Sequence, residues 1–133
     1  MVRPMPKKQL PNPTKSEMAI LRVIWQDGPS TVRTVHRQLS AKKSTGFTTV
    51  LKLMQIMLGK GILSRTEDQR PHLYSEAAPA EATQRQVVKD LMDRVFGGSA
   101  QKLVLHALSA KESTADELAE IRKVLDELEK GSK

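Results

Sequence analysis

The sequence predicts a mainly α-helical protein, in which three helices and a two-stranded β-hairpin are followed by a second helical region. Apolar residues recur at helical spacing over residues 14–59 and again from residue 81 onward. Between these regions, two short stretches with strand composition flank a polar turn. We therefore expect three parts: an arm over residues 1–13, a helix-and-hairpin domain over residues 14–78, and a helical region over residues 79–133.

The first predicted helix follows a segment that cannot be helical, because residues 1–13 contain four prolines beside three basic residues. We expect this segment to form an extended arm. Thr14-Lys15-Ser16-Glu17 has the form of a capping box, with glutamate three residues after threonine. The helix that it opens ends at Asp27-Gly28-Pro29. Its apolar residues at helical spacing are Met18, Leu21, Ile24 and Trp25.

Two further helices and a hairpin are expected before residue 78. The second helix begins at Ser30 or Thr31 and is followed by a turn over residues 40–46. The third helix covers residues 47–59 and ends at Gly59 or Gly61. Residues 62–66 and 72–75 are the predicted strands. The side chains expected to pack inward are Val32, Val35 and Leu39 of the second helix, and Val50, Leu51, Met54, Met57 and Leu58 of the third.

Three helices are expected in the second region. One apolar stripe extends from Val87 to Phe96 and is ended by Gly97-Gly98. A short helix follows around residues 103–108. Thr114-Ala115-Asp116-Glu117 is another capping box, and it opens the last helix.

Composition excludes several classes of protein. With 133 residues, 38% of them hydrophobic, the chain suits one domain, or one small domain with an accessory helical segment. It has no cysteine, which excludes disulfides and thiolate metal sites. No apolar run approaches the ~18–20 residues that cross a bilayer, and the first residues lack the apolar core of a secretory signal. We therefore expect a soluble cytoplasmic protein.

Charge is divided unevenly along the chain. Residues 1–70 contain 13 Lys and Arg against 4 Asp and Glu, a net charge of +9, whereas residues 71–133 carry −2. A basic half favours a polyanionic partner. Surface lysines that only keep a protein soluble would give the same charge balance. The motifs must therefore decide between a polyanionic partner and solubility alone.

The third predicted helix has a polar face that suits the major groove of DNA. Thr48, Lys52 and Gln55 are spaced i, i+4 and i+7, so they share one face, and none of them is acidic. Two short helices joined by a tight turn form a helix-turn-helix, whose second helix makes its deepest contacts with amino-terminal residues, here Thr48 and Thr49. Gln55 suits adenine, and Lys52 suits guanine or a phosphate. The alternative is an amphipathic surface helix whose polar residues only face water.

Basic residues flank this helix on both sides. Lys42 and Lys43 lie in the preceding turn, and Arg65 and Arg70 lie in the hairpin, or wing, that follows. We expect all four to contact phosphates beside the groove. Ordinary solvated lysines and arginines are the alternative.

Several motifs, taken in order, resemble the BlaI/MecI/CopY (penicillinase repressor) family of bacterial winged-helix repressors. The motifs are Glu17 with Ile20, Leu21 and Trp25; Thr31-Val32 and Val35; Phe47-Thr48-Thr49-Val50 and Leu53; Lys60-Gly61-Ile62-Leu63; and LMDRVFGGSAQKLVLHALS over residues 91–109. The similarity covers about residues 14–128. The resemblance implies a winged-helix DNA-binding domain over residues 14–78 and a dimerisation region over residues 79–133. It also implies a homodimer on a double-stranded DNA operator, regulated by a sensor or inducer system.

The last predicted helix independently favours a partner chain. Leu118, Ile121, Leu125 and Leu128 form a stripe that so short a region cannot cover well when it folds alone. Burying apolar area stabilises by about 25 cal/mol per Å². We expect the dimer contact to include Leu91, Val95 and Leu103 as well. The alternative is that the stripe packs on Val88, Leu91 and Val95 within one chain.

Two features depart from the family. Aligning on Leu103-Val104-Leu105 puts His106-Ala107 where β-lactam-responsive members have the Asn-Phe bond that a sensor protease is thought to cut. Induction by that route is therefore in doubt. The copper-responsive members carry a cysteine-rich tail, which this chain lacks, so release by metal binding to thiolates is excluded. The sequence identifies neither the inducing signal nor the target genes.

No constellation of residues indicates an enzyme, a metal site or a cofactor. The glycines lack the spacing of a phosphate-binding loop. His36, His72 and His106 lie far apart, and each reads as an ordinary surface or core histidine. We predict a DNA-binding transcriptional regulator: a dimeric repressor that binds an inverted repeat through residues 47–59. The alternative function is a winged-helix protein-interaction module without sequence-specific DNA binding.

Overall fold

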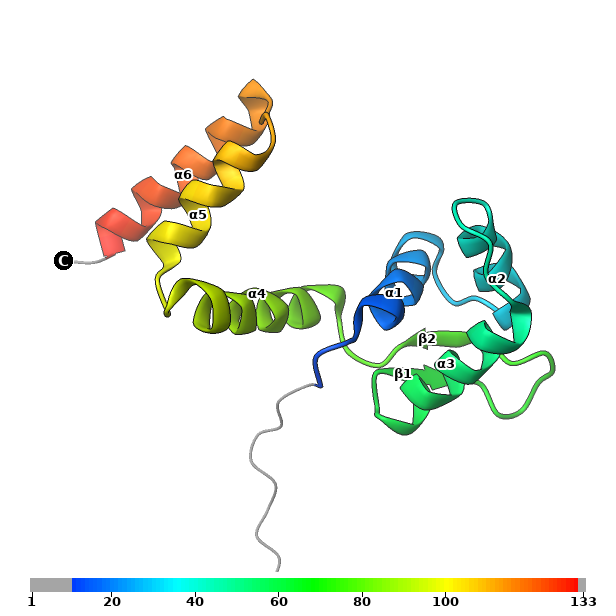
Figure 1. The fold of residues 1–133 in the computed structure, drawn as a ribbon. Coiled ribbons are helices and arrows are strands. Elements are labelled where there is room, and N and C mark those ends of the chain that lie inside the picture. The colour runs from blue at the N-terminus through cyan, green and yellow to red at the C-terminus, as the bar shows by residue number, and fades with distance from the viewer. Residues whose placement is uncertain (1–10, 132–133) are drawn as a thin grey trace, which may run out of the picture. The chain divides into compact units, whose positions relative to one another are not determined.

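The computed structural model describes residues 11–131, which form six helices and one two-stranded antiparallel sheet (Figure 1). The predicted order of three helices, a hairpin and further helices is confirmed. Residues 1–10 of the predicted arm lie outside the described residues. In chain order the elements are α1 (Lys15–Asp27), α2 (Val32–Ser40), α3 (Phe47–Gly59), β1 (Leu63–Arg65), β2 (Tyr74–Glu76), α4 (Ala80–Phe96), α5 (Ala100–Ala110) and α6 (Ala115–Gly131).

The chain divides into two compact units. The first ends at Lys89 and the second begins at Asp90, so α4 contributes to both. The division into an arm, a winged-helix domain and a dimerisation region at residues 13/14 and 78/79 remains a prediction. No helix within residues 11–131 combines the length and the apolar character that crossing a membrane requires.

Side-chain caps fix where α1 and α2 begin. The capping box at α1 is confirmed: the Glu17 amide donates to Thr14 Oγ1 over 3.1 Å, and the Thr14 amide donates to Glu17 Oε1 over 2.9 Å. Thr31 Oγ1 accepts from the Thr34 amide at the start of α2. Gly28 ends α1 with a φ of 85°, a value that favours glycine. Local sequence therefore determines these boundaries.

The core of the first unit joins α1, α2, α3 and the hairpin. Fully burying an aliphatic side chain stabilises the fold by about 1.5–3 kcal/mol, so this cluster holds the elements together. One expectation is wrong: Leu51 does not belong to the core and stays half-buried. The buried apolar residues are Ile20, Leu21, Ile24, Val35, Val50, Met54, Met57, Ile62, Leu63 and Tyr74.

The hairpin is shorter than predicted, and its second strand starts two residues later and ends one residue later than expected. Leu63 pairs with Glu76, and Arg65 pairs with Tyr74. Ile62 was expected in the first strand, but its amide donates to Met57 O at the end of α3, over 2.9 Å. Ser30, before α2, also bridges to Tyr74, with amide–carbonyl bonds of 3.0 and 2.8 Å. These bonds attach the hairpin to both α2 and α3.

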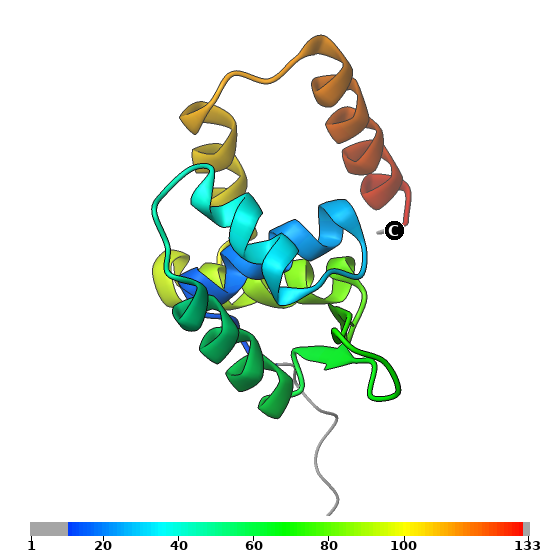
Figure 2. The ribbon, with the colours of Figure 1, turned by 90° about the vertical axis from the view of Figure 1, so that its right-hand side faces the viewer.

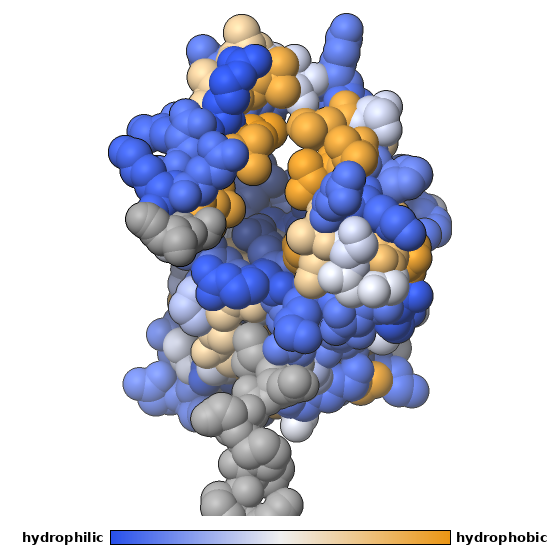
Figure 3. All heavy atoms as spheres, turned by 90° about the vertical axis from the view of Figure 1, so that its left-hand side faces the viewer, coloured by the Kyte–Doolittle hydropathy of each residue, from blue (hydrophilic) through white to orange (hydrophobic). Residues whose placement is uncertain are grey.

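The second unit leaves much apolar surface uncovered. Neither α5 nor α6 contains a buried residue. Figure 3 shows hydrophobic side chains at the surface over these two helices. The exposed fractions of Leu118, Leu125 and Leu128 are 36%, 54% and 64%. A helix with this pattern needs further cover to bury its apolar face.

Candidate nucleic-acid interface

The exposed side of α3 carries the four residues predicted to read DNA. Thr48, Thr49, Lys52 and Gln55 are all exposed, while Val50, Met54 and Met57 on the other side of α3 are buried. The helix contains no acidic residue. Figure 2 shows α3 (dark green) beside the hairpin at one side of the first unit. The structure thus brings these four residues onto one accessible surface, next to the wing.

Hydrogen bonds shape the turn that precedes α3. His36 Nε2 lies 2.8 Å from Thr45 O, and the Ser40 hydroxyl donates to the same carbonyl over 3.2 Å. Thr45 Oγ1 donates to Lys43 O over 2.9 Å. Lys42 and Lys43 themselves are exposed. The structural role of His36 was not anticipated, because its partner is nine positions away and no local motif signals the contact.

Phe47, the first residue of α3, is 40% exposed, although it is a large aromatic side chain. Its ring lies edge-on to His36, with centroids 5.5 Å apart. The guanidinium of Arg33 lies 5.8 Å from the centre of the same ring. Neither Phe47 nor Arg33 was predicted to belong to the site. Ile56, also on α3, is 42% exposed.

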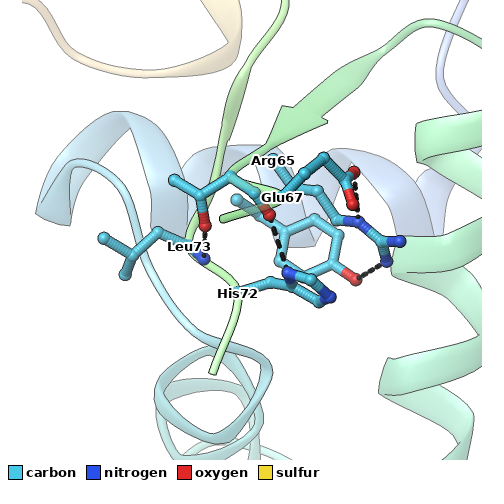
Figure 4. A network of polar contacts seen from close by, with 6 residues as sticks. Arg65, Glu67, His72 and Leu73 are labelled. Atoms are coloured by element: carbon cyan, nitrogen blue, oxygen red, sulfur yellow. Dashed lines mark hydrogen bonds and ion pairs between the residues drawn. The ribbon is translucent and has the colours of Figure 1, made fainter. Parts of the chain in front are cut away.

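The wing is held by a small polar network (Figure 4). Arg65 donates from Nε to Glu67 Oε2 over 2.9 Å and from Nη1 to the Tyr74 hydroxyl over 3.1 Å. The Leu73 amide donates to Thr66 Oγ1, and His72 Nδ1 lies 2.7 Å from Thr66 O. Because a carbonyl only accepts, His72 must carry a proton on Nδ1. The network makes the wing a defined shape rather than an open loop.

The two predicted wing arginines differ in their surroundings. The hydrogen bond between Arg65 and Glu67 lowers the pKa of Glu67 and, as the largest of several causes, raises the pKa of Arg65. Arg65 is therefore already paired with a carboxylate. Arg70 is exposed and forms no hydrogen bond or ion pair with any residue from 11 to 131. A contact between either arginine and a phosphate remains a prediction.

One long-range ion pair, which sequence reasoning did not find, joins the end of α3 to α1. Lys60, directly after α3, donates to Glu17 Oε2 over 2.8 Å. Burial alone would raise the pKa of Glu17, but hydrogen bonds from Lys60 and Thr14 outweigh it and hold that pKa below its ordinary value. Glu17 was predicted only as a helix cap, so its second partner is new.

The residues predicted to form a dimer contact are mostly accessible. Leu91, Val95, Leu118, Leu125 and Leu128 are exposed, and Leu103 and Ile121 are half-buried. A dimer contact at these residues remains a prediction, as does the alternative that the α6 stripe is covered within one chain.

No group of three or more His, Cys, Asp and Glu side chains within residues 11–131 is arranged to hold a metal ion. His36 and His72 each contact a backbone carbonyl, and His106 lies beside Phe96, with ring centroids 5.4 Å apart. The histidines thus have structural contacts in three separate places.

A family model described as penicillinase repressor matches residues 13–127 of the chain. The chain belongs to the penicillinase repressor family. This confirms the resemblance noted in the sequence, and with it a DNA-binding transcriptional repressor.

Other members of the penicillinase repressor family are similar along most of their length. The transcriptional regulator BlaI of Mycobacterium tuberculosis is 32% identical over 120 residues, which cover 86% of this chain and 83% of that protein. The penicillinase repressor of Bacillus licheniformis is 20% identical, with coverage of 90% and 94%. The solved DNA-binding domain of the repressor BlaI aligns with a TM-score of 0.50 and 20% identity, over 56% of this chain and 92% of that domain. That likeness supports the fold.

Proposed function

We propose that this penicillinase repressor family member acts as a homodimer that binds an inverted-repeat operator, with α3 of each protomer in the major groove. The observation that carries the proposal is the exposed, acid-free polar face of α3 between a basic turn and the wing. A major groove about 12 Å wide admits one such helix. We place the protein in the cytoplasm, where a regulator of bacterial genes meets its operator.

Base contacts are assigned to the exposed residues of α3. Thr48 and Thr49 stand at its amino-terminal end, where a helix in the groove lies closest to the bases. Their hydroxyls bond base edges, and their methyl groups suit the methyl group of thymine. Gln55 suits adenine, and Lys52 suits guanine or a phosphate.

Phosphate contacts are assigned to the basic residues on either side. Lys42 and Lys43 are exposed in the turn before α3, and Arg65 and Arg70 belong to the wing after it. Such contacts position a protein on the duplex without reading sequence. They also make binding depend on salt, since each one releases condensed counterions.

The dimer is assigned to the helical region. Its support is the row of exposed leucines on α6, a surface that a second chain would cover. One short helix reads few base pairs, too few to select one site among ~10⁶ or more competitors. Two copies related by a two-fold axis double the readout, and the operator must then be an inverted repeat.

A salt titration with mixed genomic DNA tests the proposal. The logarithm of the association constant of the full chain should fall linearly with the logarithm of the salt concentration. The slope should be about −0.9 for each phosphate contact. Selection from random duplexes should enrich an inverted repeat. Lys52→Gln should weaken binding, whereas Lys123→Gln, on the exposed part of α6, should not. Absence of binding at low salt would contradict the proposal and favour the protein-interaction module.

A further inference from the structure

A hollow of about 520 Å³ lies in the first unit, where the start of α2, the face of α3 next to Phe47, and the wing meet. This volume is within the range of small-molecule sites. Its walls are mainly apolar: Val32 from α2, Phe47 and Leu51 from α3, and Pro71 and Tyr74 from the wing. The half-buried position of Leu51, outside the core, is explained by its place in this wall.

The charged groups that line the hollow have one sign of charge. They are Arg33, Arg65 and Arg70, and no carboxylate lines the hollow. Two of the arginines have unused hydrogen-bonding capacity: within residues 11–131, Arg70 has no hydrogen-bonding partner, and Arg33 has only its contact with the Phe47 ring. A guanidinium pairs a carboxylate through two parallel hydrogen bonds.

We infer that this hollow binds a small organic anion, a carboxylate carried on an aromatic or other flat apolar body. A bare inorganic anion is not the best match for the hollow, because it has no apolar surface to pack against the apolar walls. The arginines disfavour a neutral apolar molecule, since such a ligand would leave them without the ion pair that the site offers. An apolar body between Phe47 and Tyr74 with its carboxylate toward Arg33 or Arg70 satisfies both.

Occupation of the hollow excludes DNA. Gln55, Arg65 and Arg70 line the hollow and are also residues to which we assign DNA contacts. A ligand that holds these side chains removes them from the duplex, so the two partners compete. The hollow is thereby an inducer site. This competition rests on the proposed DNA-binding function, whereas binding of the anion does not.

Calorimetric titration of the full chain with 2-naphthoate tests the site, with 2-naphthamide and inorganic phosphate as comparators. We expect 2-naphthoate to bind with the highest affinity of the three. Arg33→Gln and Arg70→Gln should each lower the affinity for 2-naphthoate about tenfold, because each variant removes a charge-assisted hydrogen bond. Arg22→Gln, an exposed arginine of α1 outside the hollow, is the matched control and should have no effect. Leu51→Trp should fill the hollow and abolish binding, with folding checked by circular dichroism.

Equal binding of 2-naphthamide, or an equal loss in Arg22→Gln, would overturn the site. Competition is then measured as release of mixed genomic DNA by 2-naphthoate, against the same concentration of acetate. We expect release by 2-naphthoate alone. If 2-naphthoate binds without releasing the DNA, the inducer role is overturned. A chain that binds the anion but no DNA at low salt retains the site and instead contradicts the proposed function.

Discussion

Lys60 Nζ lies 2.8 Å from Glu17 Oε2 and joins the end of α3 to the start of α1, across 43 positions of sequence. The Glu17 side chain is 2% exposed, while that of Lys60 is 38% exposed. The buried carboxylate therefore depends on a partner that approaches from the surface. Since α3 carries the residues assigned to base readout, this ion pair links the interface to α1 from outside it.

Removing the lysine should destabilise the protein. Lys60→Met leaves the buried Glu17 carboxylate without its charged donor, which costs about 1–3 kcal/mol of unfolding free energy. Urea denaturation at pH 7 measures this. Lys52→Met, an exposed lysine of α3, is the control and should change stability by less than about 0.5 kcal/mol. Equal effects of the two variants would show that the ion pair contributes nothing.

The same pair predicts how stability depends on pH. The pKa of Glu17 in the folded protein is lowered from its ordinary 4.5. A lowered carboxyl pKa contributes stability that is present above the unfolded pKa and is lost as pH falls through the folded one. We expect the wild type to lose this contribution below about pH 4.5, and Lys60→Met to lose less over the same interval. Urea denaturation of both proteins from pH 7 to pH 3 measures this. If Glu17 were not responsible for the pH dependence, the wild type and Lys60→Met would lose stability in parallel.

The threonines at the start of α3 should carry specificity. Thr48→Ala or Thr49→Ala is expected to cost about 1–3 kcal/mol of binding to the selected operator while barely changing affinity for random DNA. Fluorescence anisotropy on both duplexes measures the difference. Ser16→Ala, exposed on α1, is the control. Equal losses on both duplexes would mean that the threonines contact only phosphates.

The lysines of the turn should act on all sequences alike. Lys42→Gln or Lys43→Gln should weaken binding to any duplex and reduce the salt slope by about one, because each variant removes one cation from a phosphate. Titrations of the same duplex at several salt concentrations measure the slope. Lys111→Gln, exposed at the end of α5, should leave it unchanged. A lysine whose neutralisation does not change the slope points to solvent.

The dimer should break at the apolar stripe of α6. Changing Leu118 and Leu125 together to Asp puts unpaired charge at a seam that the partner would bury, which is heavily disfavoured. The variant should sediment as a monomer, keep its first unit folded and lose operator affinity by orders of magnitude. Lys123→Asp, on an exposed part of α6, should remain a dimer. A double variant that still binds as a dimer would place the interface elsewhere, with Phe96-Gly97-Gly98 as the next candidate.

Local patterns were enough to predict most of the fold from the sequence. Capping at Thr14 and Thr31, the stop at Gly28 and helical spacing of apolar residues place α1, α2 and α3 almost to the residue. The exposed face of α3 follows in the same way, because 3.6 residues per turn fix which side chains share a side. These features depend only on neighbours within about four positions.

Contacts between distant segments decided the rest. Ile62 has strand composition, yet its amide bonds to α3, so β1 starts one residue later than its sequence predicts. The pairing of Lys60 with Glu17, the edge-on contact of His36 with Phe47 and the hollow beside Leu51 arise only when separate elements meet. Periodicity tells which face of a helix is apolar, but not what packs against it. That depends on the three-dimensional arrangement of the elements, and so the tertiary structure alone made Leu51 the wall of a hollow rather than part of the core.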